Sequence, residues 1–284
     1  MYKIQSLKDK SFDALYESFQ DAFADYEMQV NKEELERMLI RRGFVPELSF
    51  GAFDGDKLVA FTFNGIGKYC GIETAYDTGT GTMKDYRGKG LATQIFEYSI
   101  PFLIEAGIKQ YLLEVLQHNT KAVSLYQKLG FEITREFNYF SQEVEAVQLS
   151  VNNTELDYKI KDITLTQIES LAYFFDFNPA WQNSFESIFR KPEEFKAFAA
   201  LSENIPVGFC VTEIKSGDIT QIAVNHNHRR NGIGTLLLNE ALKVNLHNSV
   251  KCINTSIGCD SITRFLESFS IPVAGKQYEM IKKI

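Results

Sequence analysis

Two short glycine-rich segments with the same pattern lie half a chain length apart. The first is Arg87-Gly88-Lys89-Gly90-Leu91-Ala92 and the second is Arg229-Arg230-Asn231-Gly232-Ile233-Gly234, so both read Arg-x-x-Gly-x-Gly/Ala. Each follows an apolar or β-rich stretch and precedes an apolar run with helical periodicity. A loop of small residues between a strand and a helix presents backbone N–H groups at the positive end of the helix dipole. The two segments therefore predict two sites that hold phosphate.

The repeat also predicts how the chain is divided. Its spacing is half of the 284-residue length, which indicates two copies of one domain of ordinary size. We expect the domains to cover residues 1–150 and 154–284, with the polar stretch Val151–Thr154 as the linker. Neither segment is a P-loop, because no Gly-Lys-Ser/Thr ends it, and neither has the full G-x-G-x-x-G of a dinucleotide site.

The elements that would position the first segment follow from periodicity and turn residues. Asp54-Gly55 between two apolar runs predicts a hairpin. The Gly/Thr-rich stretch 72–83 leads into the loop, and Gly107 and Gly130 end the two helices that follow it. We expect helices at 11–24, 31–42, 91–106 and 120–129, strands at 48–53, 57–66 and 111–116, and one or two closing strands within 131–147.

The second half repeats this order after the linker. We expect helices at 164–175, 192–199, 233–246 and 261–269, and strands at 198–201, 207–214, 219–224 and 250–256. The sequence thus predicts an α/β protein of two tandem domains, each with a mixed, mostly antiparallel sheet flanked by helices.

Composition narrows the class of protein. The net charge is −7 and the pI about 5.3, so nucleic acid is not expected as a partner. No apolar run is long enough to span a membrane, and the N-terminus lacks the apolar segment of a signal peptide. We expect a cytoplasmic protein. The four cysteines form no C-x-x-C pair and the histidines have no third partner nearby, so buried reduced thiols and no metal are expected.

Two further motifs make the first half resemble a known family. Tyr86–Ala92 is followed by Leu112-Leu113-Glu114-Val115 and then by Asn119-x-x-Ala122-x-x-Leu125-Tyr126-x-x-Leu129-Gly130-Phe131. These segments resemble the GNAT superfamily of acetyl-coenzyme A-dependent N-acetyltransferases. The second half resembles the same family through Ile222-Ala223-Val224 and His228–Gly234. The resemblance implies acetyl-CoA as the cofactor and an amine as the acceptor.

The resemblance implies where each copy would hold the coenzyme. Backbone N–H groups of the loop would bind the pyrophosphate, and the end of the preceding strand would pair with the pantetheine arm as an added strand does. The implied residues are Thr82, Met83, Arg87, Gly88, Lys89, Gly90, Leu91, Ala92, Thr93 and Asn119 in the first copy, and Val224, Asn225, Arg229, Arg230, Asn231, Gly232, Ile233, Gly234 and Thr235 in the second.

The resemblance also implies the groups that move protons. Tyr126, two helical turns after Asn119, would protonate the departing thiolate or hydrogen-bond its sulfur. Attack needs a neutral amine, so a carboxylate would accept its proton. Glu114, on the strand next to the cleft, is one candidate, and Glu73 and Asp77 before the loop are others. Tyr26 and the single tryptophan, Trp181, are candidates for contact with the acceptor; a packed core role is the alternative for Trp181.

The second copy departs from the motif that follows the loop. Aligning the ends of the two helices places Cys259 opposite Asn119 and Leu266 opposite Tyr126. The sequence therefore favours an N-acetyltransferase that moves acetyl to a primary amine by direct attack in a ternary complex, with catalysis in the first domain. The alternative is a non-catalytic acetyl-CoA-binding regulatory or structural module, above all in the second half. The acceptor is a small-molecule or peptide amine, and the chain is a monomer or homodimer.

Overall fold

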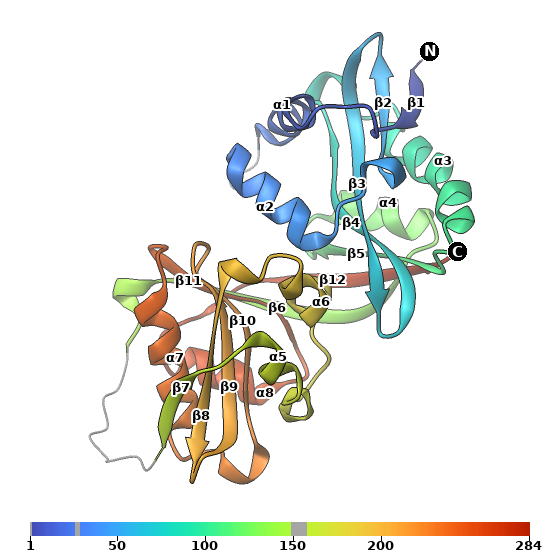
Figure 1. Ribbon diagram of the computed structural model, residues 1–284. Helices are drawn as coiled ribbons and strands as arrows, with labels where there is room; N and C mark the ends of the chain where they lie inside the picture. The colour runs from blue at the N-terminus through green and yellow to red at the C-terminus, as the bar shows by residue number, and fades with distance from the viewer. Residues whose placement is uncertain (1, 26–28, 149–157) are drawn as a thin grey trace. The chain divides into compact units, whose positions relative to one another are not determined.

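The chain forms two compact units (Figure 1). The computed structural model describes residues 2–25, 29–148 and 158–284. The N-terminal unit comprises the chain up to Thr134 together with Tyr278–Ile284, and the C-terminal unit comprises Arg135–Gln277. The expected linker lies outside the described residues, so the ranges 1–150 and 154–284 remain a prediction for the repeated domain. The compact units differ from those ranges at residues 135–148 and 278–284.

The N-terminal unit contains a sheet with the strand order β1-β2-β3-β4-β5-β12. Its β4–β5 pair is parallel, and the β1–β2, β2–β3 and β3–β4 pairs are antiparallel, as expected. The strands are β1 (Lys3–Ser6), β2 (Phe50–Asp54), β3 (Lys57–Tyr69), β4 (Ile72–Thr82), β5 (Gln110–Leu116) and part of β12 (Val273–Lys283). The helices are α1 (Phe12–Phe23), α2 (Lys32–Arg42), α3 (Leu91–Glu105) and α4 (Thr120–Lys128).

Local chemistry fixes where these helices begin and end. The Ser11 side chain caps α1, and Asn31 and Glu34 form a reciprocal capping box on α2. Gly43 ends α2 at a φ of +80°, a backbone conformation that glycine adopts without strain. Figure 1 shows α1 and α2 on one face of the sheet and α3 on the other. Each face has its own apolar core, such as Leu15 with Phe61 and Ile95 with Val59.

The C-terminal unit repeats this plan with the strand order β6-β11-β10-β9-β8-β7. Its strands are part of β6 (Glu132–Glu143), β7 (Lys159–Asp162), β8 (Phe195–Ser202), β9 (Ile205–Glu213), β10 (Asp218–Val224) and β11 (Ser249–Ser256). Its helices are α5 (Leu165–Glu169), α6 (Phe185–Phe189), α7 (Ile233–Val244) and α8 (Asp260–Glu267). The described residues contain no helix that is long and apolar enough to cross a membrane.

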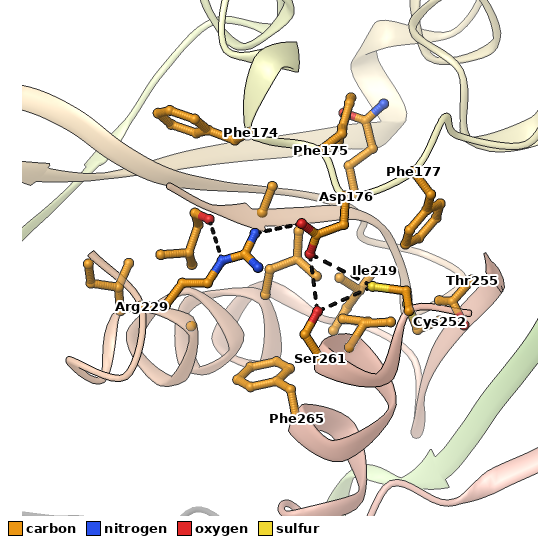
Figure 2. Close-up of a pocket in the computed structure, with 18 of the residues that line it drawn as sticks. Phe174, Phe175, Asp176, Phe177, Ile219, Arg229, Cys252, Thr255, Ser261 and Phe265 are labelled. Atoms are coloured by element: carbon orange, nitrogen blue, oxygen red, sulfur yellow. Dashed lines mark hydrogen bonds and ion pairs between the residues drawn. The ribbon is translucent and has the colours of Figure 1, made fainter. Parts of the chain in front are cut away.

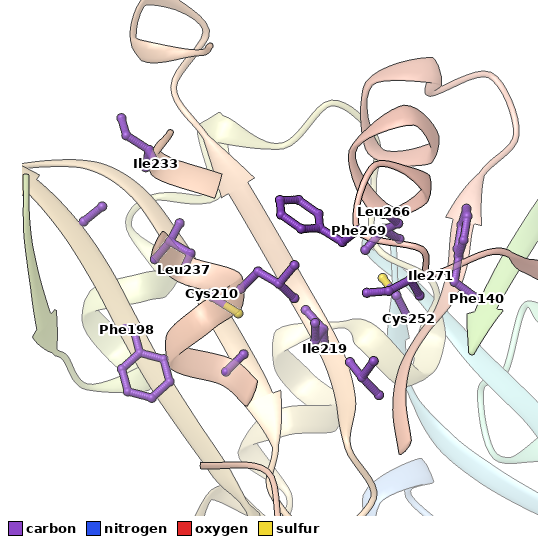
Figure 3. Packing of buried hydrophobic residues seen from close by; sticks show 14 of the residues in the cluster. Phe140, Phe198, Cys210, Ile219, Ile233, Leu237, Cys252, Leu266, Phe269 and Ile271 are labelled. Atoms are coloured by element: carbon purple, nitrogen blue, oxygen red, sulfur yellow. The ribbon is translucent and has the colours of Figure 1, made fainter. Parts of the chain in front are cut away.

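The largest core of the C-terminal unit lies between its sheet and the helices α7 and α8 (Figure 3). Leu237 of α7 and Leu266 of α8 are fully buried there. Ile219 of β10 and Cys252 of β11 are buried in the same core. Burial of such side chains contributes roughly 1.5–3 kcal/mol each. Cys210 and Cys252 are buried as expected, whereas Cys70 is exposed at the β3–β4 turn.

The expectation of a helix at 192–199 is wrong. Only Pro192–Glu194 forms a helical turn, of 3₁₀ type, and β8 begins at Phe195. Apart from the exposed Lys196, the run Phe195–Ala200 is buried, and a short, mainly apolar run of this kind fits a buried strand as well as a helix. The expected helix at 164–175 is likewise broken, into α5 and a 3₁₀ turn at Ala172–Phe174.

Each unit is completed by a strand from the other half of the sequence. In the N-terminal unit, Met280 of β12 is fully buried in the core, and the carboxylate of Glu279 accepts hydrogen bonds from the hydroxyls of Tyr69 and Thr134, each at 2.8 Å. In the C-terminal unit, β6 pairs antiparallel with β11, with Phe140 opposite Cys252. The expectation that 131–147 closes the first copy is therefore wrong for its second part.

Candidate functional site

The loop before α3 has the conformation of an anion cradle. Gly88 and Gly90 have φ values of +76° and +72°, and α3 begins at the next residue, Leu91. The first intrahelical bond runs from the Gln94 N–H to the Gly90 carbonyl. The helix offers no carbonyl to the N–H groups of its first turn, which here are those of residues 91–93. These groups are placed to bind a phosphate, as the sequence predicts.

The loop before α7 repeats this conformation residue by residue. Arg230 and Gly232 have φ values of +64° and +78°, α7 begins at Ile233, and the Leu236 N–H donates to the Gly232 carbonyl. The two cradles differ at their first left-handed position, which is Gly88 in one and Arg230 in the other. A non-glycine residue there is strained, so this position in the C-terminal unit is held against a backbone preference.

The leading arginine of each repeat holds its cradle to the protein. Arg87 donates to the carbonyl of Thr82 at 3.2 Å, to that of Ala22 at 2.9 Å and to the carboxylate of Asp25 at 3.2 Å. Arg229 donates in the same way to the carbonyl of Val224 at 3.0 Å and to Asp176 at 2.9 Å. Each guanidinium group therefore binds the last residue of the preceding strand and one carboxylate. The carboxylate is that of Asp25, just after α1, or that of Asp176, between β7 and β8.

The strand that leads into each cradle separates from its parallel neighbour. Pairing of β4 with β5 covers only Thr74–Tyr76, and pairing of β10 with β11 is confined to Asp218 opposite Lys251. Each leading strand then carries a β-bulge, at Thr78 in β4 and at Thr220 in β10. Bulges are common next to active sites, where they re-aim the strand. The opening between the strands fits an extended ligand arm.

Backbone direction at the strand ends supports this fit. The N–H groups of Met83 and Asn225 donate to the carbonyls of Val59 and Val207 in the neighbouring antiparallel strand, each at 2.9 Å. In a strand, the backbone N–H and C=O groups of successive residues point alternately to the two sides of the strand. The N–H groups of the preceding residues, Thr82 and Val224, therefore point toward the opening, where an added arm would pair with them, while their carbonyls accept from Arg87 and Arg229.

Tyr126 and Asp77 meet at the point where β4 leaves β5. The Tyr126 side chain on α4 is buried, and its hydroxyl lies 3.4 Å from Oδ2 of Asp77. Oδ2 also accepts from the Thr80 hydroxyl at 2.8 Å, and Oδ1 accepts from the Gly79 N–H at 2.9 Å. Burial raises the pKa of Asp77 to about 6, although these hydrogen bonds act in the opposite direction. Asn119 caps α4 through its side chain, which accepts from the Ala122 N–H at 3.3 Å.

The other two candidate carboxylates lie in different surroundings. Glu114, on β5, accepts a hydrogen bond from the Tyr76 hydroxyl at 2.9 Å. Burial, and then the charge of Glu114, raise the pKa of Tyr76 well above its ordinary value, which keeps the phenol protonated. Glu73 is exposed near the first residue of β4 and forms an ion pair with Lys68 at 3.4 Å. The structure brings Asp77 and Tyr126 together and leaves Glu73 four residues away along β4.

The two aromatic candidates for acceptor contact do not join this group. Trp181 is 2% exposed and has the guanidinium of Arg190 over its ring at 5.3 Å. Its position is that of a core side chain in the C-terminal unit. Tyr26 lies outside the described residues.

The C-terminal unit encloses a cavity of about 410 Å³ that extends from its cradle to the splayed strands (Figure 2). Phenylalanines form much of its wall, and the carboxylate of Asp176 lies between Arg229 and Ser261. Asp176 accepts from Arg229 at 2.9 Å, from Ser261 at 3.1 Å and from the Cys259 thiol at 3.7 Å. Burial acts to raise the pKa of Asp176, but Arg229 and then Ser261 outweigh it and lower that pKa.

Of the two replacements expected in the C-terminal unit, only Leu266 belongs to its core. Leu266 is fully buried on α8 (Figure 3), and Cys259 stands at the N-cap of that helix. The Cys259 thiol lies 3.2 Å from the Ser261 hydroxyl. Among the described residues, no group of three His, Cys, Asp or Glu side chains is placed to hold a metal ion.

The bulge residues, Asp176 and three amide side chains that line the cavity, those of Asn183, Gln221 and Asn254, were not predicted from the sequence. A signal for the bulges was present, since Thr78 and Thr220 stand at the same distance before their cradles. The roles of Asp25 and Asp176 have no such signal, because the segments that carry them differ between the two halves.

Comparison with known proteins agrees with this geometry. Residues 12–131 and 163–259, together more than half of the chain, match the acetyltransferase (GNAT) family. The chain belongs to the GNAT family. Two GNAT domains follow each other in it. GNAT enzymes transfer acetyl from acetyl-CoA to amine acceptors.

Two curated GNAT relatives match about a third of the chain. N-alpha-acetyltransferase MAK3 of Arabidopsis thaliana is 29% identical over 107 residues, which are 37% of this chain and 56% of that protein. N-alpha-acetyltransferase 30 of Schizosaccharomyces pombe is 29% identical over 103 residues, which are 36% of this chain and 69% of that protein. The chain thus spans little more than half the length of the Arabidopsis relative.

Two solved GNAT structures share the fold over the whole chain. A GCN5-related N-acetyltransferase from Sphaerobacter thermophilus superposes with a TM-score of 0.74 at 14% identity, covering 99% of this chain and 95% of that one. A tandem GNAT protein from the clavulanic acid biosynthesis pathway gives 0.73 at 12% identity, covering 100% and 98%. The second of these, with the two matched segments of the family, confirms the expected tandem GNAT fold.

Proposed function

We propose that this chain transfers an acetyl group from acetyl-CoA to a primary amine, and that the N-terminal unit carries out the transfer. The observation that carries the proposal is the Tyr126–Asp77 pair at the point where β4 separates from β5. A phenol and a carboxylate with a pKa of about 6 are groups that can exchange protons near neutral pH.

The residues of the N-terminal cradle and of the strand that leads into it fit the coenzyme. The amides of residues 91–93 would bind its pyrophosphate, Gly88 and Gly90 give the loop the required backbone, and the backbone of Thr82 would pair with its arm. When bound, acetyl-CoA supplies a thioester that an amine can attack. Arg87 contributes by fixing the cradle to β4 and α1 rather than through a free guanidinium.

Tyr126, Asp77 and Glu114 have separate roles in this proposal. Tyr126 donates its proton to the departing sulfur, which leaves a phenolate, and Asp77 orients the phenol. The proton released by the attacking amine then reprotonates the phenolate through a carboxylate or water. The acceptor amine must be neutral to attack, so Glu114 or Asp77 accepts its proton directly or through water. Glu73 lies near the start of β4, four residues before Asp77. Glu114 and Asp77 are therefore preferred to Glu73 as the group that accepts this proton.

The acceptor is proposed to be the amine of a peptide or of a small molecule. Two relatives carry the name N-alpha-acetyltransferase, so a peptide N-terminus is the first acceptor to test. The net charge of −7 suits a cationic acceptor and disfavours nucleic acid. The chain would act as a monomer or homodimer in the cytoplasm.

A second candidate function concerns the C-terminal unit. Its cradle has the conformation of the first, and its cavity of about 410 Å³ reaches the splayed strands. Leu266 occupies the position of Tyr126, so this unit lacks the proposed proton donor. These observations favour a coenzyme-binding module without transfer.

One experiment on the full chain separates these possibilities. Acetyl transfer to a panel of peptides and small amines is measured for the wild type, for Tyr126→Phe and for Tyr98→Phe, which changes a tyrosine on the exposed side of α3. We expect kcat to fall at least ~100-fold in Tyr126→Phe only, the usual size of a general acid effect. Wild-type turnover in Tyr126→Phe would remove this residue from the mechanism.

The cradles are tested in parallel with a matched pair of variants. Gly90→Ala and Gly232→Ala each place a methyl group at a left-handed position. We expect the first to abolish turnover and the second to leave it intact while lowering coenzyme stoichiometry from two per chain to one. Loss of turnover in Gly232→Ala alone would move catalysis to the C-terminal unit.

A further inference from the structure

Three side-chain amides that line the C-terminal cavity, here called its floor, have oxygen atoms with no hydrogen-bond partner among the described residues. They belong to Asn183, Gln221 and Asn254, all of which line the cavity. Their residues are 5%, 4% and 0% exposed, so water outside the protein does not solvate these oxygens. A buried polar atom without a partner is unfavourable and calls for a ligand or another explanation.

The orientation of two of these amides is fixed by their nitrogen atoms. Nδ2 of Asn183 donates to the carbonyl of Ile253 in β11 at 2.8 Å, and Nε2 of Gln221 in β10 donates to the carbonyl of Asn183 at 2.7 Å. Asn183 thus connects the two splayed strands at the floor. Because the NH₂ groups are used on backbone carbonyls, the side-chain oxygens remain as acceptors.

Asn254 is held in an unfavourable state in two respects. Its φ is +56°, in the left-handed region, within an irregularity of β11 between Cys252 and Thr255. Neither its Oδ1 nor its Nδ2 has a partner among the described residues, although the side chain is fully buried. Strained backbone and unsatisfied amides tend to lie where a protein binds something.

We propose that this floor binds the nitrogen of a primary amine whose apolar body lies against the phenylalanine wall. A primary ammonium group has three N–H donors, and the floor offers three amide oxygens. Much of the remaining wall is aromatic, from Phe174, Phe175, Phe177, Phe265 and Phe269. The cavity volume of about 410 Å³ accommodates an arylalkylamine.

The comparison with the N-terminal unit supports a site special to this half. The position in the repeat that corresponds to Asn254 is occupied by Glu114, whose carboxylate accepts from Tyr76. The N-terminal unit thus places a charged, bonded group where the C-terminal unit places a neutral, unpaired one.

The test measures binding of phenethylamine to the full chain by calorimetry without acetyl-CoA, with 2-phenylethanol as the matched compound. We expect the amine to bind at least ~10-fold more tightly than the alcohol, which has one donor in place of three. Asn254→Gly and Gln221→Met should each weaken amine binding at least ~10-fold. Asn254→Gly should also raise the melting temperature, because it removes a strained residue and a buried amide.

A control variant separates backbone strain from recognition. Asn204 has a φ of +68° in the exposed β8–β9 turn, so Asn204→Gly relieves similar strain and should leave amine binding unchanged. Equal affinity for the amine and the alcohol, no binding of the amine by the wild type, or wild-type binding by Asn254→Gly would each overturn the proposal. The measurement needs no acetyl transfer, so its failure is distinguishable from failure of the proposed function.

Discussion

The Tyr126 hydroxyl lies 3.4 Å from the Asp77 carboxylate and connects α4 to β4 in the N-terminal unit. The corresponding positions of the C-terminal unit are Leu266 and Ile219, where Ile219 precedes the bulge at Thr220 as Asp77 precedes that at Thr78. Both are buried in one apolar core (Figure 3). A polar pair in the N-terminal unit thus corresponds to an apolar pair in the C-terminal unit. This difference is the reason for proposing that the N-terminal unit is the catalytic one.

The pH dependence of turnover tests the role of Asp77. Its pKa is about 6, so its carboxylate form predominates above that pH and is lost below it. We expect kcat of the wild type to fall on the acid side of about pH 6. In Asp77→Asn the rate should be lower and this acid limb absent. An unchanged limb in Asp77→Asn would assign the titration to another group.

The same carboxyl group affects stability in the opposite direction. Burial raises its folded-state pKa from 3.8 to about 6, so the folded state binds the proton more strongly than the unfolded state does. The free energy of unfolding should therefore decrease as pH rises from about 4 to 6, by about 3 kcal/mol for this group. Urea denaturation at pH 4 and pH 7 checks this, with Asp77→Asn expected to lack that decrease.

The first left-handed position of each cradle gives a matched pair of stability changes. Arg230→Gly should raise the free energy of unfolding by roughly 0.5–1 kcal/mol, since its φ of +64° is strained for arginine. Gly88→Ala should lower it by about 1 kcal/mol at a φ of +76°. Thermal unfolding of both variants measures the effects. Destabilisation by Arg230→Gly would mean that contacts of the Arg230 side chain outweigh the backbone strain.

A substitution of Met280 tests whether β12, from the second half of the sequence, stabilises the N-terminal unit. It is fully buried in the N-terminal unit, so Met280→Ala should destabilise that unit by roughly 2–5 kcal/mol. The single tryptophan, Trp181, belongs to the C-terminal unit and reports on it by fluorescence. We expect turnover to be lost at lower urea in the variant, with little change in the fluorescence midpoint. Equal shifts of both would show that the units unfold together.

Much of the fold is readable from the sequence because strong local signals mark its elements. The Asp54-Gly55 hairpin, the caps of α1 and α2, and the cradles lie where periodicity and turn residues place them. Residues 192–199 were misread because a short apolar run fits either a helix or a buried strand. The exchange of β6 and β12 has no local signal, since a strand looks the same whichever sheet it joins.

The candidate site was predictable where it follows a motif. Tyr126, Asp77 and the cradle residues were named from the sequence, and the structure brings the first two together. Their roles stay predictions. The side-chain role of Arg87 was missed because its partners, Ala22 and Asp25, lie on an element far away in the sequence. The three amide side chains of the C-terminal cavity were missed because the fold, and no local sequence pattern, determines which asparagines and glutamines are buried.

The exchange of strands also sets an order for biosynthesis. Every residue of the proposed catalytic pair and its cradle has been synthesised once the ribosome has passed Tyr126, but β12 has not. The core around Met280 stays open until Tyr278–Ile284 leave the exit tunnel. Domains generally fold during synthesis from the N-terminus onward. We therefore expect the unit that is translated first to complete its core last, and the proposed acetyltransferase activity to arise only after the second unit has been synthesised.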